Sequence, residues 1–186
     1  MRIIAGKHRG LALAALGKGD AGAHLRPTTD RTRESLFNVL AGGRFGDPIT
    51  DATVLDLFAG TGALGLEALS RGASHVTFVD DGRKAQSLIS ENIAKCRAQS
   101  DTTLLRSDAT RLPGNLGAPF TLVFLDPPYA KSLGEKALAA ALAGGWIAPD
   151  ALIVWEESAA ITPPDTLTLL DTRKYGDTKI HFLEPA

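Results

Sequence analysis

The sequence has almost no cysteine and no long apolar stretch, the features that would form disulfides or span a membrane. Its 186 residues include one cysteine, Cys96, so no intrachain disulfide can form, and this usage suits a reducing cytoplasm. No stretch approaches the ~18 uninterrupted apolar residues of a membrane span, and charges interrupt the first ten residues. We therefore expect a monomeric cytoplasmic protein with one core and no membrane contact.

The sequence also lacks the signs of metal or thiol chemistry. Its four histidines show no metal-ligand spacing with one another or with Cys96. Cys96 falls in a helical pattern away from the predicted strand ends, which argues against a catalytic thiol. We expect no metal ion.

Net charge is nearly absent at −1, but the charges are spread unevenly. Residues 1–45 carry eight basic and three acidic residues, so the remainder is acidic. A basic segment of this kind can neutralise phosphates, although ordinary domains show similar unevenness by chance. The candidates for nucleic-acid contact are Lys7, Arg9, Arg26, Arg31 and Arg33.

From residue 53 onward, short β-branched runs alternate with longer helical patterns. This alternation predicts an α/β fold in which a parallel sheet is wound with helices. The expected strands are 53–58, 75–80, 102–108, 120–126 and 151–157, and the expected helices are 63–72, 83–96 and 136–145. Residues 167–170 and 179–183 predict an antiparallel hairpin, joined through the polar stretch 171–178, that closes the sheet.

The first 50 residues predict two smaller features. Residues 2–16 alternate weakly around Gly6 and Gly10, as in a small β-hairpin. Thr28 or Thr29 can cap a helix with an apolar face, which the glycines at 42 and 43 end. We treat residues 1–25 as an appendage and 26–186 as the main domain.

Most of the expected strands end in or near an acidic residue. In open α/β sheets, ligands bind at the carboxyl ends of the strands, so these acids would face one crevice. A single acid there needs no explanation, because strand ends enter solvent. Several at one edge favour a binding site, and they are Asp56, Asp80, Asp108, Asp126 and Glu156.

The stretch from Gly60 to Gly65 matches the G-x-G-x-x-G dinucleotide pattern after a strand. Asp56 at the end of that strand argues against NAD, because a carboxylate disfavours a nearby pyrophosphate. It would attract a ligand with a cationic amine, such as S-adenosylmethionine. Asp80 can then accept hydrogen bonds from the ribose hydroxyls. Asp108 either accepts from the adenine amino group or simply caps a turn. Near these acids, the candidates for cofactor contact also include Phe58, Gly60, Gly62 and Ala109.

The strand 120–126 continues into Asp126-Pro127-Pro128-Tyr129. Two prolines fix the backbone and remove two N–H donors, so this segment predicts a rigid ledge. An amino group on a base is a poor nucleophile, and it needs acceptors that hold its N–H bonds. The Asp126 carboxylate and the Pro127 carbonyl are suitable acceptors, and Tyr129 offers a face for stacking. The alternative is an ordinary turn.

Three segments together resemble the bacterial 16S ribosomal RNA guanine-N2 methyltransferase family that modifies guanine 966. They are RPTTDRTRESLFN at 26–38, DLFAGTGALGLEA at 56–68 and DPPY at 126–129. The glycine stretch is typical of Rossmann-like methyltransferases in general, and DPPY of amino-group methylation. The stretch 26–38 indicates this one family.

The resemblance implies a Rossmann-like class I methyltransferase with a seven-stranded, mostly parallel sheet and a C-terminal antiparallel hairpin. It implies that Asp56, Gly60, Gly62, Asp80 and Asp108 line the S-adenosylmethionine crevice. It further implies that Asp126 and Tyr129 hold a flipped guanine, and that the basic N-terminal segment faces 16S rRNA in the small ribosomal subunit. Asp80 is preferred to Asp81 for the ribose because it directly continues its strand.

Two other functions use similar motifs. An N6-adenine DNA methyltransferase would have a similar loop, but this chain has no room for the separate target-recognition domain that is usual there. An RNA-binding module with a merely structural cofactor is opposed by the intact segment 126–129.

Overall fold

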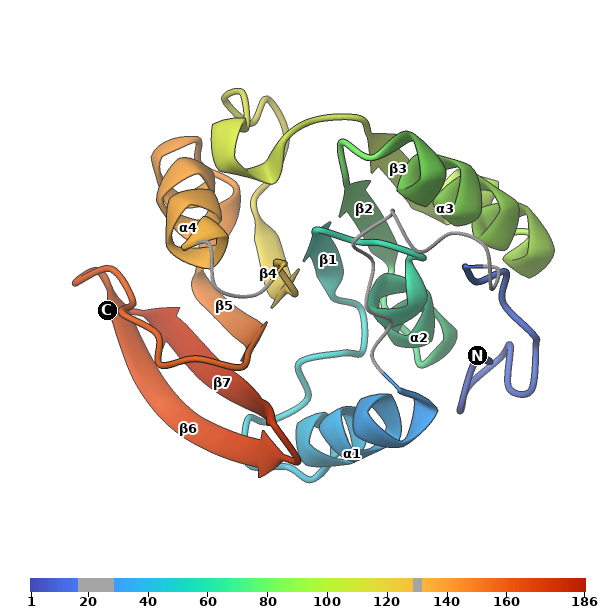
Figure 1. Cartoon of the computed structure of the whole chain (residues 1–186), viewed down its shortest axis with the longest axis horizontal. Helices are drawn as coiled ribbons and strands as arrows, with labels where there is room; N and C mark the ends of the chain where they lie inside the picture. The colour runs from blue at the N-terminus through green and yellow to red at the C-terminus, as the bar shows by residue number, and fades with distance from the viewer. Residues whose placement is uncertain (17–28, 129–131) are drawn as a thin grey trace.

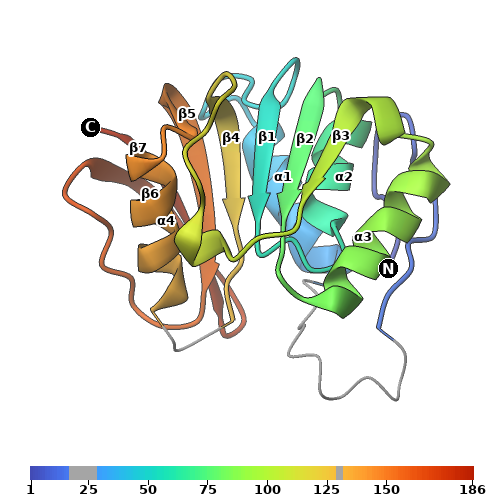
Figure 2. The same ribbon diagram turned by 90° about the horizontal axis from the view of Figure 1, so that it is seen from above.

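The computed structural model describes residues 1–16, 29–128 and 132–186. In these ranges a seven-stranded sheet has the order β3-β2-β1-β4-β5-β7-β6 (Figures 1 and 2). The elements are α1 (Asp30–Ala41), β1 (Thr53–Leu57), α2 (Ala63–Ser70), β2 (His75–Val79), α3 (Arg83–Cys96), the short 3-10 helix η1 (Gln99–Asp101), β3 (Thr102–Leu105), the 3-10 helix η2 (Ala109–Arg111), β4 (Phe120–Leu125), α4 (Leu133–Ala143), β5 (Ile147–Glu157), β6 (Leu167–Tyr175) and β7 (Thr178–Pro185).

Strands β1 to β5 pair in parallel, and β7 pairs antiparallel with β5 and β6. This confirms the predicted Rossmann-like class I methyltransferase fold with its C-terminal hairpin. No helix in the described ranges is long and apolar enough to cross a membrane.

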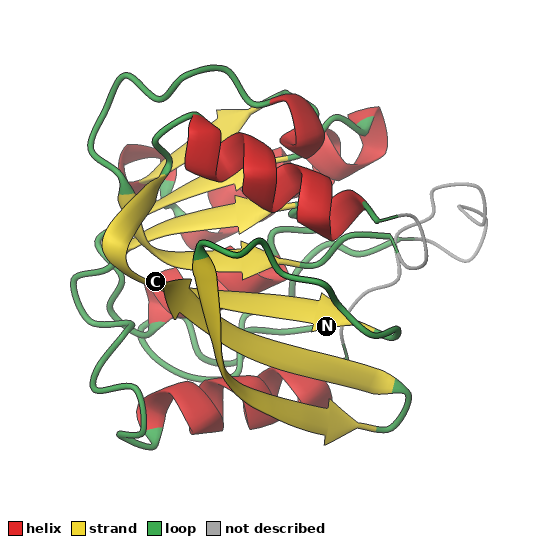
Figure 3. Cartoon of the chain, turned by 90° about the vertical axis from the view of Figure 1, so that its left-hand side faces the viewer, coloured by secondary structure: helices red, strands yellow, loops and turns green. Residues whose placement is uncertain are grey.

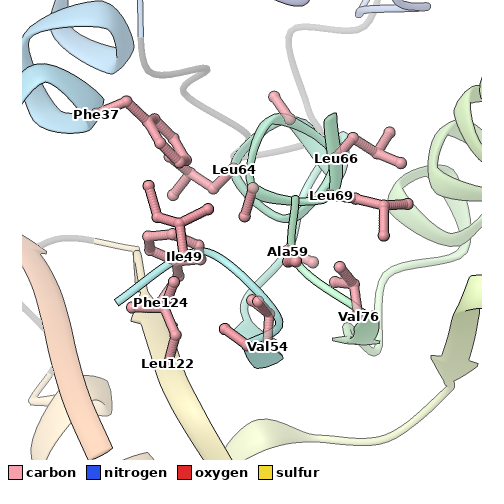
Figure 4. Packing of buried hydrophobic residues seen from close by; sticks show 14 of the residues in the cluster. Phe37, Ile49, Val54, Ala59, Leu64, Leu66, Leu69, Val76, Leu122 and Phe124 are labelled. Carbon is pink, nitrogen blue, oxygen red and sulfur yellow. The ribbon is translucent and has the colours of Figure 1, made fainter. Parts of the chain in front are cut away.

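Helices cover both faces of the parallel strands, so these strands carry apolar side chains on both faces. On one face, residues from α1, α2 and α3 pack on alternate strand positions such as Val54 and Phe124. Figure 4 shows this side, where the Phe37 and Phe124 rings lie 5.8 Å apart. On the other face, α4 packs on Leu55, Leu125 and their neighbours.

The C-terminal hairpin is longer than the sequence predicted. The polar stretch 171–178 was expected to join two short strands, but most of it belongs to β6 and β7. Only residues 176–177 form the turn, because pairing continues to Tyr175 and Thr178. β6 is the edge strand of the sheet, and an edge strand tolerates polar residues on both faces, so hydrophobic patterning underestimated its length.

Helix α1 begins and ends as its sequence predicts. The Thr29 side chain accepts a hydrogen bond from the Thr32 amide, and Gly42 is the C-cap. Its buried face consists of Arg33, Leu36, Phe37 and Leu40. A charged side chain in this apolar face needs a buried partner.

Glu67 on α2 is that partner, and neither its side chain nor that of Arg33 is exposed to solvent. The Arg33 Nε atom lies 3.8 Å from Glu67 Oε2, and the Arg71 Nε atom donates to Glu67 Oε1 at 2.8 Å. The same carboxylate accepts from the amides of Ile4 and Ala5, at 2.7 and 3.0 Å. Glu67 therefore joins α1, α2 and the N-terminal segment.

The N-terminal segment is part of the domain core. Residues 1–13 fold back on themselves through one bridge between Arg2 and Ala12, with backbone hydrogen bonds on either side. Ile3 and Leu13 belong to the main hydrophobic cluster. The predicted boundary at residue 25 falls outside the described residues.

Replacing Glu67 with Gln tests this junction. The substitution removes the buried countercharge of Arg33 and leaves its guanidinium only Asp30, whose Oδ1 atom lies 2.9 Å from Arg33 Nη2 on a side chain that is 38% exposed. We therefore expect a loss of about 3 kcal/mol in the free energy of unfolding, measured by urea titration. Glu91→Gln is the matched control, because Glu91 pairs with Lys95 on the exposed surface of α3 and should cost less than about 0.5 kcal/mol. Equal losses in the two variants would contradict a stabilising role for Glu67.

Candidate active site

The glycine turn connects β1 to α2 at the carboxyl edge of the sheet. Gly60 and Gly62 have φ angles of 60° and 77°, a region that side chains other than glycine rarely adopt. Gly65 has a different role, since a Cβ atom there would stand 2.5 Å from the Phe78 ring. The third glycine therefore allows α2 to pack closely on β2.

Asp80 fixes this turn to the end of β2. One carboxylate oxygen accepts from the Gly60 amide and the other from the Gly82 amide, each at 2.9 Å. Burial raises the pKa of Asp80, and these two amides partly oppose the shift. Asp81, the neighbouring carboxylate, is exposed. Asp80 is therefore the carboxylate bound to the glycine turn, and its contact with a ribose stays a prediction.

Asp56 lies beneath the turn instead of opening into the crevice. Its side chain is 1% exposed, and its Oδ2 atom accepts from the Gly65 amide at 3.0 Å. Burial raises its pKa to about 8, against the Gly65 hydrogen bond and together with the nearby Asp80. The sequence interpretation of Asp56 as a charged group that meets the ligand amine is therefore wrong in this structure: the carboxyl is buried and supports the turn.

Phe58, Asp108 and Ala109 lie at the ends of β1 and β3. Phe58 has a φ of 57° and packs partly on the second hydrophobic cluster. Asp108 caps η2, because its Oδ1 atom accepts from the hydroxyl and amide of Thr110 at 2.7 and 2.8 Å. These bonds hold the pKa of Asp108 below its usual value. Of the two predicted roles, the turn cap is present, and among the described residues the second carboxylate oxygen has only Arg111 near it, at 4.0 Å. Ala109 is 3% exposed.

The segment Asp126-Pro127-Pro128 begins directly at the end of β4. β4 pairs with β1 so that Leu125 lies opposite Leu57, and the Asp126 amide donates to the Leu57 carbonyl at 3.4 Å. The proline ledge and the glycine turn therefore leave the sheet side by side. Tyr129, the fourth predicted catalytic residue, lies outside the described residues.

Trp155 lies next to the end of β4 and also contacts the start of α4. It lies opposite Leu125 in the β4–β5 register, one residue before Asp126. Its indole also packs on Gly134 in the first turn of α4, where a Cβ atom would stand 2.4 Å from Cζ2. Trp155 has no exposed surface. From the sequence, Trp155 is predicted only as part of a strand, because nothing there relates it to Gly134.

Asn92 is a second residue that the sequence did not reveal. It lies on α3 and is fully buried. Its Nδ2 atom donates to the carbonyls of Thr61 and Ala14 at 2.9 and 3.0 Å, and its Oδ1 atom accepts from the Ala14 amide at 2.6 Å. Asn92 therefore joins the glycine turn to the N-terminal segment. An asparagine on a mostly buried helix face was the only available signal.

The predicted nucleic-acid contacts are dispersed. Arg31 is exposed at the start of α1, whereas Arg26 lies outside the described residues. Arg33 is wrong as a surface contact, because its side chain is fully buried by the ion pair with Glu67. The Lys7 amide donates to the carbonyl of Ser70 at the far end of α2, so Lys7 and its neighbour Arg9 lie at the amino edge of the sheet. Figure 2 shows this turn of the chain on the side away from the strand arrowheads.

Replacing Asp56 with Asn tests its burial. Because its folded-state pKa of about 8 lies above the ordinary value of 3.8, the carboxyl contributes stability that is complete below about pH 4 and is lost as the pH rises through 8. The free energy of unfolding of the wild-type protein should therefore fall more steeply between about pH 5 and pH 8 than that of the variant, in urea titrations at each pH. Parallel profiles would show that Asp56 titrates normally.

Replacing Gly134 with Ala tests the contact with Trp155. The added methyl group overlaps the indole, so we expect a loss of about 1–3 kcal/mol, although alanine otherwise favours a helix. Trp155→Phe removes part of the overlapping ring. In a double-mutant cycle by urea unfolding, the double variant should be less destabilised than the sum of the two single variants. Simple additivity would rule out the contact.

Comparisons with known proteins agree with this geometry. The family model described as "Conserved hypothetical protein 95" matches residues 1–184. The Ribosomal RNA small subunit methyltransferase D of Escherichia coli K12 is 40% identical over 156 residues, which are 84% of this chain and 74% of the relative. The protein of the same name from Haemophilus influenzae is 36% identical over 181 residues, covering 95% and 89% of the two chains.

A solved structure extends the likeness to the whole fold. The Escherichia coli protein yhhF superposes with a TM-score of 0.82 at 34% identity, covering all of this chain and 97% of the other. These matches confirm the family that the motifs at 26–38, 56–68 and 126–129 indicate. The chain therefore belongs to the family of Ribosomal RNA small subunit methyltransferase D, and it is an S-adenosylmethionine-dependent methyltransferase.

Proposed function

We propose that this protein methylates the exocyclic N2 amine of guanine 966 in 16S ribosomal RNA, within the small ribosomal subunit. The relatives from Escherichia coli and Haemophilus influenzae are named for methylation of small-subunit ribosomal RNA. The observation that carries the proposal is the position of Asp126-Pro127-Pro128 beside the glycine turn, at the ends of the paired strands β4 and β1. This arrangement supports a role for the first segment in holding the amine and for the second in binding the cofactor.

The residues present fit S-adenosylmethionine. When bound, this cofactor supplies a methyl group that its sulfonium already activates for direct in-line transfer. The glycine turn permits close approach of the cofactor to the backbone, and Asp80 keeps lone pairs that can accept from ribose hydroxyls. Asp108 has one carboxylate oxygen left for the adenine amino group, while Phe58 and Ala109 border the same edge. Asp56 acts through the turn that it supports.

In the proposed mechanism, residues 126–129 hold the target base for methyl transfer. The amine lone pair of guanine is delocalised into the ring, so the base must be held out of its stack with both N–H bonds occupied. The Asp126 carboxylate and the Pro127 carbonyl accept these two bonds, and Pro128 keeps the segment rigid. Tyr129 provides the stacking face. With the cofactor bound, transfer would break its S–CH3 bond as the N–CH3 bond forms, and the Asp126 carboxylate would accept the proton that the nitrogen loses.

Asp126→Ala tests the assignment. Removing the acceptor should lower methyl transfer by at least 100-fold, a scale typical of a lost positioning or proton-accepting group, while S-adenosylmethionine affinity stays within about two-fold. The measurement is transfer of labelled methyl groups to 16S rRNA, free and in small subunits from cells that lack this methylation, followed by mass mapping. Asp150→Ala is the control, because Asp150 is exposed on β5. Label on adenine, on DNA or on protein would refute the proposal.

A further inference from the structure

The turn between β6 and β7 carries basic side chains that the proposed mechanism does not use. Arg173 and Lys174 lie just before Tyr175, the last residue of β6, and Lys179 is the second residue of β7, with Asp177 as the acid between them. Arg173 and Lys174 are exposed and Lys179 is half-buried. We call Arg173, Lys174 and Lys179 the hairpin cluster.

Sheet topology brings the hairpin cluster to the edge of the sheet where the parallel strands end and where Asp126 follows β4. We call this the catalytic edge. β5 runs parallel to β4, and β7 runs antiparallel to β5, so β7 begins where β5 ends. The register pairs Lys179 with Glu157, the last residue of β5. In Figure 3 the turn between the two long front strands lies on the side to which the arrowheads of the central strands point. The cluster therefore shares an edge with the segment that begins at Asp126.

The charges in this turn are poorly compensated. Lys174 and Lys179 are directly opposite each other in the β6–β7 register, an arrangement of like charges that destabilises a strand pair. Within the described residues neither ammonium forms an ion pair, and Glu157 instead accepts from the Ser158 amide at 2.8 Å. Arg173 donates to Asp171 at 2.8 Å, and Arg44 also lies 3.5 Å from that carboxylate. An anion at this turn would relieve the repulsion between the lysines.

Most of the described basic residues of the N-terminal segment and α1 lie away from the catalytic edge or are buried. Lys7 and Arg9 lie at the amino edge, and Arg33 is buried. Of the described basic residues predicted to contact RNA, Arg31 remains exposed at the start of α1. The exposed Arg83 and Lys84 begin α3 on the β2 side of this edge, whereas a polyanion on the β5 side of Asp126 would meet the hairpin cluster.

We propose that Lys174 and Lys179, with Arg173, bind phosphates of the substrate RNA next to the nucleotide that reaches Asp126. Such contacts orient the strand and carry no base specificity. The inference rests on the proposed function for its RNA substrate. It adds a contact surface at the opposite end of the sequence from the basic N-terminal segment.

The variant Lys174→Gln with Lys179→Gln tests the surface through the salt dependence of binding. Each lost phosphate contact should reduce the slope of log Kd against log salt concentration by about 0.7–0.9, so the pair should reduce it by about 1.5. Kd for a 16S rRNA fragment, measured by fluorescence anisotropy, should rise several-fold at about 0.1 M salt, while S-adenosylmethionine affinity stays unchanged.

Lys95→Gln with Arg97→Gln is the matched control. It removes the same charge from the end of α3, which lies at the amino edge, and should retain the wild-type slope. If the hairpin variant keeps the wild-type slope on RNA that the wild-type enzyme methylates, the inference fails and the proposed function stands. If the variant loses affinity for small subunits but keeps the slope on free RNA, the surface contacts a protein and the inference also fails. If the wild-type enzyme methylates neither form of the RNA, the proposed function fails.

Discussion

The arrangement of α1, α2 and the N-terminal segment depends on the hydrogen bonds and ion pairs of the buried Glu67 carboxylate. It accepts two amides of the N-terminal segment and lies between the guanidinium groups of Arg33 and Arg71. A carboxylate with no exposure is costly unless its oxygens are satisfied, so α1, α2 and residues 4–5 must keep these positions together. Arg71 also lies over the Phe37 ring, 4.8 Å from its centroid, which joins the ion pair to the hydrophobic core.

The glycine turn depends on a second set of buried polar groups. Asp56 supports it from below through Gly65, Asp80 holds it from β2 through Gly60, and Asn92 holds it from α3 through Thr61. Three side chains from three elements thus fix one short loop before any ligand arrives. A preformed loop saves the conformational entropy that ordering it on binding would cost. The same Asn92 also holds Ala14, so the N-terminal segment and the glycine turn are mechanically connected.

The proposed catalytic segment and the proposed RNA-binding residues lie at one edge of the sheet, because all parallel strands end there. The ledge at 126–128 follows β4, the glycine turn follows β1, and the hairpin cluster lies where β7 begins beside β5. This edge combines rigid acceptors for an amine with basic groups suited to phosphates. The opposite edge carries Lys7 and the end of α2, and no predicted catalytic residue in the described ranges lies there.

The sequence by itself determined the alternation of strands and helices, a threonine cap at residue 28 or 29, the glycine turn and the proline segment at 127–128, because local patterning and backbone restrictions produce these features. The tertiary structure decided the rest, because burial is a property of packing. Arg33 looks like its exposed neighbour Arg31 in the sequence, but it lies on the buried face of α1, where Glu67 and Asp30 balance its charge. Asp56 looks like any acid at a strand end, and only the close packing of Gly65 on β2 buries it. The basic residues near position 175 look like a polar connection, and only the antiparallel register carries them to the edge where β4 and β5 end.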